Sequence, residues 1–284
     1  MSTTSLCAPA ALHRGWARRL PGFLAELHWR QPALAWSGWA SLAILVLCLA
    51  AMAFDARLLN GVSVWVKPAK FAASFVAWYG TLAWAFGLLA PQARGTAAAR
   101  VVLWGTLGFG WFEMGWIALR AAQGLRSHFA PDPLGDLMYR LMGVGALGLV
   151  VLAAILGMLV LRRGDPDRPA LSRAAMGWGL VLAGILGGAA GIAISINGGP
   201  YLHGTASDGA NLAPFFWSRD GGDLRVAHFL GIHAMQALPF LGAVLQRAGR
   251  ASAGGPWLAL GGAFWVALTG WAFLRALMGQ PVLG

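Results

Sequence analysis

Acidic and imidazole side chains lie within several apolar segments of this chain, where they could carry out chemistry. Glu113 is the clearest case, because apolar residues surround it in the segment from Trp111 to Trp116. A carboxylate in such a setting must be protonated, pair with a cation or bind a ligand. His228 and His233 share a later apolar segment and could transfer protons. We therefore take Glu113, His228 and His233 as candidate catalytic residues.

The same residue types offer ligands for a metal ion. The candidate metal set is His128, His228, His233 and Glu113, which suits a mixed histidine and carboxylate site or the axial ligation of haem. On an ideal helix His228 and His233 point about 140° apart, so a single metal ion cannot take both from that helix alone. The sequence leaves open whether the cofactor is haem, a divalent metal or absent. It contains no paired zinc cysteines, His-Glu-x-x-His segment, phosphate loop or Gly-x-Ser-x-Gly segment.

A second set of polar residues suits an anionic ligand. Its cations would form a positive pocket for a carboxylate, a phosphate or a lipid headgroup. Asp223 is a good N-cap for the segment that follows it. Arg225 opposes the dipole of that helix, so we expect an acid such as Asp136 or Asp220, or an anionic ligand, beside it. The candidate ligand-binding residues are Lys67, Lys70, Arg120, Asp136, Arg140, Asp223, Arg225 and Gln236.

Membrane-spanning helices must position these side chains. A span needs about 20 mostly apolar residues, and seven segments of the chain meet that requirement. We expect an all-α polytopic fold with spans near residues 33–54, 64–90, 99–122, 137–161, 174–197, 224–245 and 257–278. At about 1.5 Å per residue, Glu113 and His233 each lie roughly 13 Å below the outer end of their spans. We therefore expect one shared polar hollow in the outer half of the bundle.

Composition supports the membrane assignment. Of 284 residues, 58% are hydrophobic and only 11% are charged, against about 25% charged residues in an ordinary soluble domain. This balance excludes a soluble globular protein, a disordered chain and a disulfide scaffold. The net charge of +11 comes almost entirely from Arg in short loops, which indicates topology control and anionic lipids rather than nucleic acid.

The distribution of basic residues predicts the orientation. Twelve of the 21 Lys and Arg residues fall on the side of the N-terminus, which we place in the cytoplasm of a bacterial inner membrane. Residues 1–32 are expected to form a cytoplasmic amphipathic arm, and residues 33–284 the seven-helix domain. Residues 198–222 are long for a connection between helices, and we interpret them as a lid over the outer opening.

Three segments resemble a group of bacterial multi-pass inner-membrane proteins. They are Lys67-Pro-Ala-Lys70-Phe, Arg126-Ser-His-Phe129 and the segment from Gly222 to Gln236. The resemblance covers spans two to six and implies that these residues form one site, but it assigns no chemistry to it.

Three functions remain open from the sequence. The first is a membrane enzyme or redox protein with a site at the outer face, dependent on haem or a metal and acting on a small anionic or lipid-like ligand. The second is a transporter or channel for an anion or a proton-coupled solute, which the scarcity of polar residues in the inner halves of the spans disfavours. The third is an accessory subunit, with an oligomeric state that the sequence does not determine.

Overall fold

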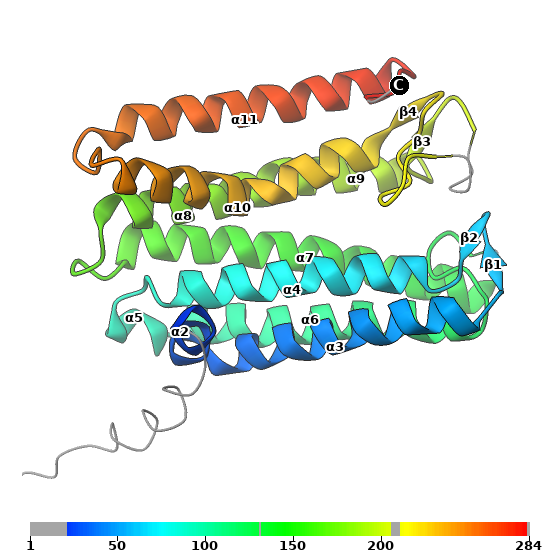
Figure 1. The fold of residues 1–284 in the computed structure, drawn as a ribbon, viewed down its shortest axis with the longest axis horizontal. Helices are drawn as coiled ribbons and strands as arrows, with labels where there is room; N and C mark the ends of the chain where they lie inside the picture. The colour runs from blue at the N-terminus through cyan, green and yellow to red at the C-terminus, as the bar shows by residue number, and fades with distance from the viewer. Residues whose placement is uncertain (1–21, 131, 206–210, 283–284) are drawn as a thin grey trace, which may run out of the picture.

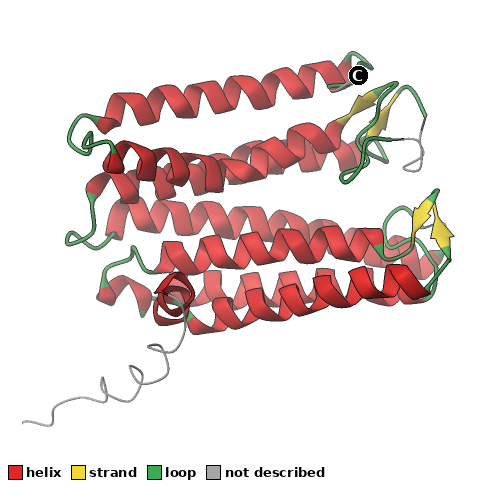
Figure 2. Ribbon diagram, viewed as in Figure 1, coloured by secondary structure: helices red, strands yellow, loops and turns green. Residues whose placement is uncertain are grey.

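The computed structural model describes residues 22–130, 132–205 and 211–282, and most of them are helical (Figure 1 and Figure 2). The long helices lie side by side as an elongated bundle. They are α3 (Pro32–Phe54), α4 (Val66–Phe86), α6 (Ala97–Ala122), α7 (Pro133–Arg163), α8 (Ala170–Leu182), α10 (Leu224–Arg247) and α11 (Gly254–Leu277). The π-helical turn η1 (Ala183–Gly187) and the helix α9 (Gly188–Ile196) continue α8.

Within these described residues, five helical segments are long and apolar enough to cross a membrane. They are α3, α7, the α8–η1–α9 segment, α10 and α11. The expectation of a multi-pass membrane protein is confirmed at this level. The long helices α4 and α6 also match predicted spans, but α4 carries Lys67 and Lys70 while α6 carries Glu113 and Arg120. Large apolar side chains face outward, as in Phe54 and Phe264, which are 91% and 65% exposed.

Short elements close the two ends of the bundle. The helices α2 (Gly22–Arg30) and α5 (Pro91–Arg94) lie at one end. The opposite end, called the hairpin end below, holds the antiparallel pairs β1 (Leu58–Leu59) with β2 (Val62–Ser63) and β3 (Tyr201–Leu202) with β4 (Gly222–Asp223). The C-terminus lies at the hairpin end (Figure 1). The β3–β4 pair, with Tyr201 opposite Asp223, joins the two ends of the predicted lid segment.

Glycine allows the closest helix contacts. Gly157 of α7 and Gly177 of α8 face one another, and a Cβ atom on Gly157 would lie 2.6 Å from the Gly177 carbonyl oxygen. Gly231 of α10 meets η1 in the same way, where a Cβ atom would lie 2.6 Å from the Gly187 nitrogen. Small residues at such crossings permit backbone approach in membrane helices.

The N-terminal arm is described only from residue 22. Arg30 of α2 is 7% exposed and donates hydrogen bonds to Glu26 and to the backbone oxygen of Trp84 in α4. Its guanidinium also lies 3.9 Å from the centroid of the Trp84 ring. This helix is therefore docked on the bundle, whereas residues 1–21 of the expected arm lie outside the described residues.

Candidate functional site

Glu113 lies at the centre of the first candidate group. It is 2% exposed on α6, and its Oε1 atom has no hydrogen-bond partner among the residues that the structure describes. Gly145 of α7 makes room for it, since a Cβ atom there would lie 3.0 Å from Oε1. An unpartnered carboxylate oxygen in a buried place is costly. Because no structural pairing accounts for this oxygen, Glu113 is a strong candidate for chemistry.

Lys67 and His128 complete this group, which we call the Glu113 centre. Lys67 lies in the first turn of α4, and its charge acts on both Glu113 and His128. The partly buried His128 ring packs among Phe71, Phe129 and Tyr139, with ring centroids 5.9 to 6.4 Å apart. Burial, with the nearby charge of Lys67, holds the pKa of His128 well below 6.5. The imidazole is therefore neutral at physiological pH.

Two further polar groups extend from the Glu113 centre into the bundle. The Tyr79 hydroxyl and the Thr106 hydroxyl have no hydrogen-bond partner, and the residues are 1% and 0% exposed. Thr106, Gly110 and Glu113 occupy one stripe of α6 at spacings of four and three residues. The Tyr79 hydroxyl lies directly against Gly110. A line of unpartnered polar atoms therefore leads away from Glu113, and the sequence reasoning missed it although the spacing was visible.

The second group surrounds Arg225 and differs in being fully paired. Asp223 caps α10, accepting from the Arg225 nitrogen at 3.0 Å, and also binds the Arg225 guanidinium at 2.8 Å. The guanidinium donates further hydrogen bonds to the Tyr201 hydroxyl and the Phe216 carbonyl. The cap on α10 was correctly predicted. The acid expected beside Arg225 is Asp223, not Asp136 or Asp220, because the side chain folds back onto its own N-cap.

The predicted lid segment packs onto α10 and α4. Phe215 stacks on Trp217, and both rings contact Phe229 of α10 at centroid distances of 5.0 and 5.3 Å. Lys70 of α4 donates to the Phe215 carbonyl at 3.3 Å and lies 5.1 Å from the centroid of the Phe216 ring. The aromatic residues of the segment thus pack against the apolar surface of α10.

The remaining candidate cations form ion pairs near the hairpin end. Arg120, a candidate ligand-binding residue, binds Asp132 at 2.8 Å. The Gly135 N–H group and Arg120 hold the pKa of Asp132 below its usual value. Asp136 and Arg140 pair with one another at 3.0 Å and are 58% and 74% exposed. The expected pocket of clustered cations is therefore divided into separate pairs.

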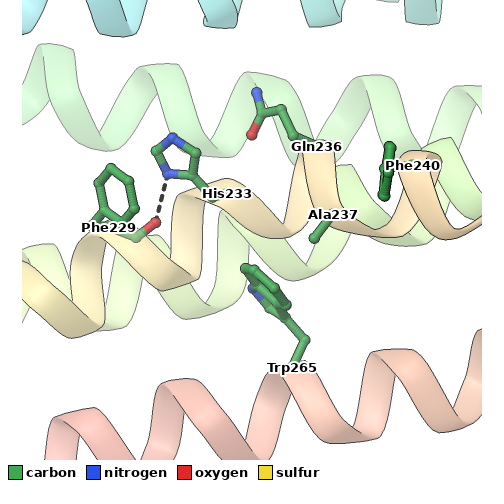
Figure 3. A pocket seen from close by; sticks show the side chains of 6 residues that line it. All are labelled: Phe229, His233, Gln236, Ala237, Phe240 and Trp265. Carbon is green, nitrogen blue, oxygen red and sulfur yellow. Dashed lines mark hydrogen bonds between the residues drawn. The ribbon is translucent and has the colours of Figure 1, made fainter.

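His228 and His233 have different surroundings. His228 donates from Nδ1 to the Gly187 carbonyl at 2.9 Å, which ties α10 to the π-helical turn η1. His233 donates from Nδ1 to Phe229 one turn back and faces an open cavity (Figure 3). Gln236 faces the same cavity. We call this third group the His233 cavity; its lining residues are Phe229, His233, Gln236, Ala237, Phe240 and Trp265.

The candidate metal set is not brought together. In the part of the chain that the structure describes, no three His, Cys, Asp or Glu side chains are grouped as metal ligands would be. The metal set of His128, His228, His233 and Glu113 divides among the Glu113 centre, the η1 contact and the His233 cavity. Helix α6 carries Glu113 and α10 carries His228 and His233, while His128 lies in the loop after α6. Instead of the single polar hollow expected from the sequence, the structure has three separate polar groups: the Glu113 centre, the group around Arg225 and the His233 cavity.

Comparison with known proteins gives no further assignment: no protein-family model, no curated protein and no solved structure matches the chain.

Proposed function

We propose that this chain is a seven-span protein of the bacterial inner membrane with its N-terminus in the cytoplasm. The five apolar helices together with α4 and α6 supply seven crossings, and the excess of basic residues beside the N-terminus supports the orientation. A periplasm-dependent reporter, such as alkaline phosphatase, fused after residue 284 should be active. A cytoplasmic location of that fusion would contradict the proposal.

Within this topology, the Glu113 centre binds a small anionic or lipid-like ligand and exchanges a proton with it. The main observation that supports this function is the buried Glu113 carboxylate. Its Oε1 atom has no partner among the described residues. Lys67 supplies the positive charge that an anionic group would seek, and the neutral His128 ring can accept a proton. An anion placed beside Glu113 would raise the proton affinity of that carboxylate, so binding should be accompanied by proton uptake.

Calorimetry on the detergent-purified full chain tests this function, with sodium phosphate and sodium oleate as probes in buffers of different ionisation enthalpy. We expect one probe to bind with proton uptake. Lys67→Met should weaken binding at least tenfold, since it removes the cation whose charge acts on Glu113. Glu113→Gln should keep measurable binding and lose the proton uptake.

Arg140→Gln provides the matched control, because Arg140 is an exposed cation at the same end of the bundle. It should leave the affinity and the proton uptake unchanged. Failure of both probes to bind, or equal binding by the Lys67→Met variant, would contradict the proposal.

The inner part of the bundle favours a second candidate function, a proton-coupled transporter. Tyr79 and Thr106 extend the line of polar atoms inward from Glu113, and such intramembrane polar groups mark proton or ion pathways. Flux of the bound probe through proteoliposomes, abolished in a Tyr79→Phe and Thr106→Val double variant, would favour transport over an enzyme.

A further inference from the structure

The His233 cavity lies on an exposed face of α10 and has a volume of about 480 Å³. Phe229, His233, Gln236 and Phe240 follow one another at spacings of four, three and four residues, so they share one stripe of the helix. Trp265 of α11 borders the cavity (Figure 3). Phe240 is 70% exposed at one end of the stripe. In a membrane-spanning bundle this face would be open to lipid.

The orientation of His233 is fixed by two contacts. Its ring stacks on Phe229 with a centroid distance of 3.9 Å, and its Nδ1 atom lies 2.7 Å from the Phe229 carbonyl oxygen. A carbonyl oxygen only accepts hydrogen bonds, so the proton is on Nδ1. In the neutral ring the Nε2 atom therefore offers a lone pair, and Figure 3 shows it on the side of the ring away from Phe229.

Gln236 presents a second acceptor. The Thr81 hydroxyl donates to the Ala77 carbonyl at 2.8 Å, so it must accept the hydrogen bond from Gln236, at 2.9 Å. That contact assigns the amide nitrogen to the Thr81 side and leaves Oε1 without a partner. Figure 3 shows this oxygen turned toward His233. His233 Nε2 and the buried Gln236 Oε1 are thus two hydrogen-bond acceptors, one turn apart, beside the cavity.

The chemistry of the cavity lining indicates which kind of ligand could donate a hydrogen bond to these acceptors. No cationic side chain is among its six lining residues, and the Trp265 indole N–H already donates to the Leu230 carbonyl at 2.8 Å. A carboxylate or phosphate would meet acceptors without a compensating charge. A neutral hydroxyl can donate to such acceptors, and a hydrocarbon chain can cover Phe229, Phe240 and Trp265.

We propose that the His233 cavity binds the hydroxyl group of a neutral, membrane-soluble amphiphile. The inference rests on the membrane placement in the proposed function but not on the Glu113 centre. The hydroxyl donates to His233 Nε2 or Gln236 Oε1, and the hydrocarbon lies along the exposed stripe of α10. An aliphatic alcohol, such as a diacylglycerol, and the phenolic group of a prenylated hydroquinone share this chemistry.

Native mass spectrometry of the full chain in detergent tests the site with matched probes. Oleyl alcohol donates a hydrogen bond, whereas methyl oleate has a similar chain and only accepts. We expect the alcohol to bind at least about tenfold more tightly, the ratio that one lost hydrogen bond of about 1.4 kcal/mol gives. Didecanoylglycerol and decylhydroquinone then distinguish the two sources, and a preference for either supports the proposal.

Variants locate the binding. His233→Phe and Gln236→Leu should each reduce the preference for the alcohol, and the double variant should abolish it. Phe264→Leu is the control, because Phe264 is exposed on α11 outside the cavity lining. Equal binding of oleyl alcohol and methyl oleate to the wild type would overturn the inference. So would a double variant that folds, as judged by its thermal midpoint, and keeps the preference.

The calorimetry with the anionic probes separates this site from the Glu113 centre. Lys67→Met should weaken binding of the anionic probe, phosphate or oleate, that binds at the Glu113 centre and leave the preference for oleyl alcohol intact, while the His233 and Gln236 variants should do the reverse. The proposed function and this inference can therefore fail independently.

Discussion

The Glu113 centre and the Arg225 network contain the same residue types but differ in how their polar atoms are paired. Asp223 is 2% exposed and receives hydrogen bonds from Ser218, from the Arg225 backbone and from its guanidinium. Glu113 is also 2% exposed, yet its Oε1 atom has no partner. Burial alone does not identify a functional residue; the useful signal is a buried polar atom that the fold leaves unpaired.

The loop conformation at Phe216 sharpens this contrast. Phe216 has a φ of 59°, a left-handed conformation that is unfavourable for a bulky residue. The hydrogen bond from Arg225 to its carbonyl oxygen, at 2.6 Å, helps to hold it there. The polar groups around Arg225 thus stabilise the lid segment and the start of α10, whereas those around Glu113 stabilise no visible element.

The largest expected effect comes from breaking the Arg225 network. Arg225→Ala should lower the free energy of unfolding in detergent by about 3–5 kcal/mol, because it leaves the buried Asp223 carboxylate without its charge partner. Thermal or denaturant unfolding of the purified protein measures the loss. Arg140→Ala is the control and should cost only about 0.5 kcal/mol or less, since that pair is exposed. Equal losses in both variants would remove the distinction between the two pairs.

Glu113→Gln should have the opposite effect on stability. Because the buried Oε1 atom has no partner to lose, this substitution should leave the free energy of unfolding unchanged or raise it by about 1 kcal/mol. Proton uptake on ligand binding should be lost in the same protein. Leaving a buried hydrogen-bonding group unsatisfied costs about 1–3 kcal/mol. If Glu113→Gln lowered the free energy of unfolding by more than about 2 kcal/mol, Glu113 would have a structural role.

Thr106→Val should also stabilise the bundle slightly. The Thr106 hydroxyl is fully buried and unpaired, so exchanging it for a methyl group should raise the free energy of unfolding by about 0.5–1 kcal/mol. Thr269→Val is the comparison, because the Thr269 hydroxyl donates to the Trp265 carbonyl at 2.9 Å. Thr269→Val should therefore not raise the free energy of unfolding. Denaturant unfolding of both variants under the same conditions measures the difference.

The last expected effect is a pH dependence from His128. Its pKa is below 6.5 in the folded state, so the folded protein binds fewer protons than the unfolded chain. This contribution to stability is complete above pH 6.5 and decreases as the pH falls below that value. We expect a decline of about 1 kcal/mol between about pH 6.5 and pH 5.5, visible as a falling thermal midpoint.

His128→Gln should flatten this decline. The carboxyls with lowered pKa values, Asp132 and Asp220, lose their contributions only in more acidic solution, near and below pH 3.8. A His128→Gln protein with an unchanged slope between about pH 6.5 and pH 5.5 would show that another group causes the decline.

Sequence patterning predicted much of the fold. Each predicted span overlaps a long helical segment, and Asp223 caps α10 as its residue type indicates. The boundaries differ where capping residues decide them: α7 begins at Pro133 because Asp132 accepts a hydrogen bond from the Gly135 nitrogen. The ion pair of Asp136 and Arg140, four residues apart on one helix, also follows from local spacing.

The arrangement of the site could be predicted only in part. Local spacing correctly separated His228 from His233 on α10, but it could not show that His228 would bind the carbonyl of Gly187. Nor could it show that Arg120 would pair with Asp132 rather than Glu113. These choices depend on how helices rotate about their axes and on which residues pack between them.

The sequence by itself determined the apolar helices, the concentration of polar residues toward one end and the caps that begin several helices, because these depend on composition and short-range spacing. Only the tertiary structure decided which of those polar residues are paired. Pairing requires side chains from different helices to meet within about 3 Å, and the packing of small residues such as Gly145 and Gly187 sets that geometry. The difference between the paired Arg225 and the unpaired Glu113 oxygen is therefore a property of the folded bundle.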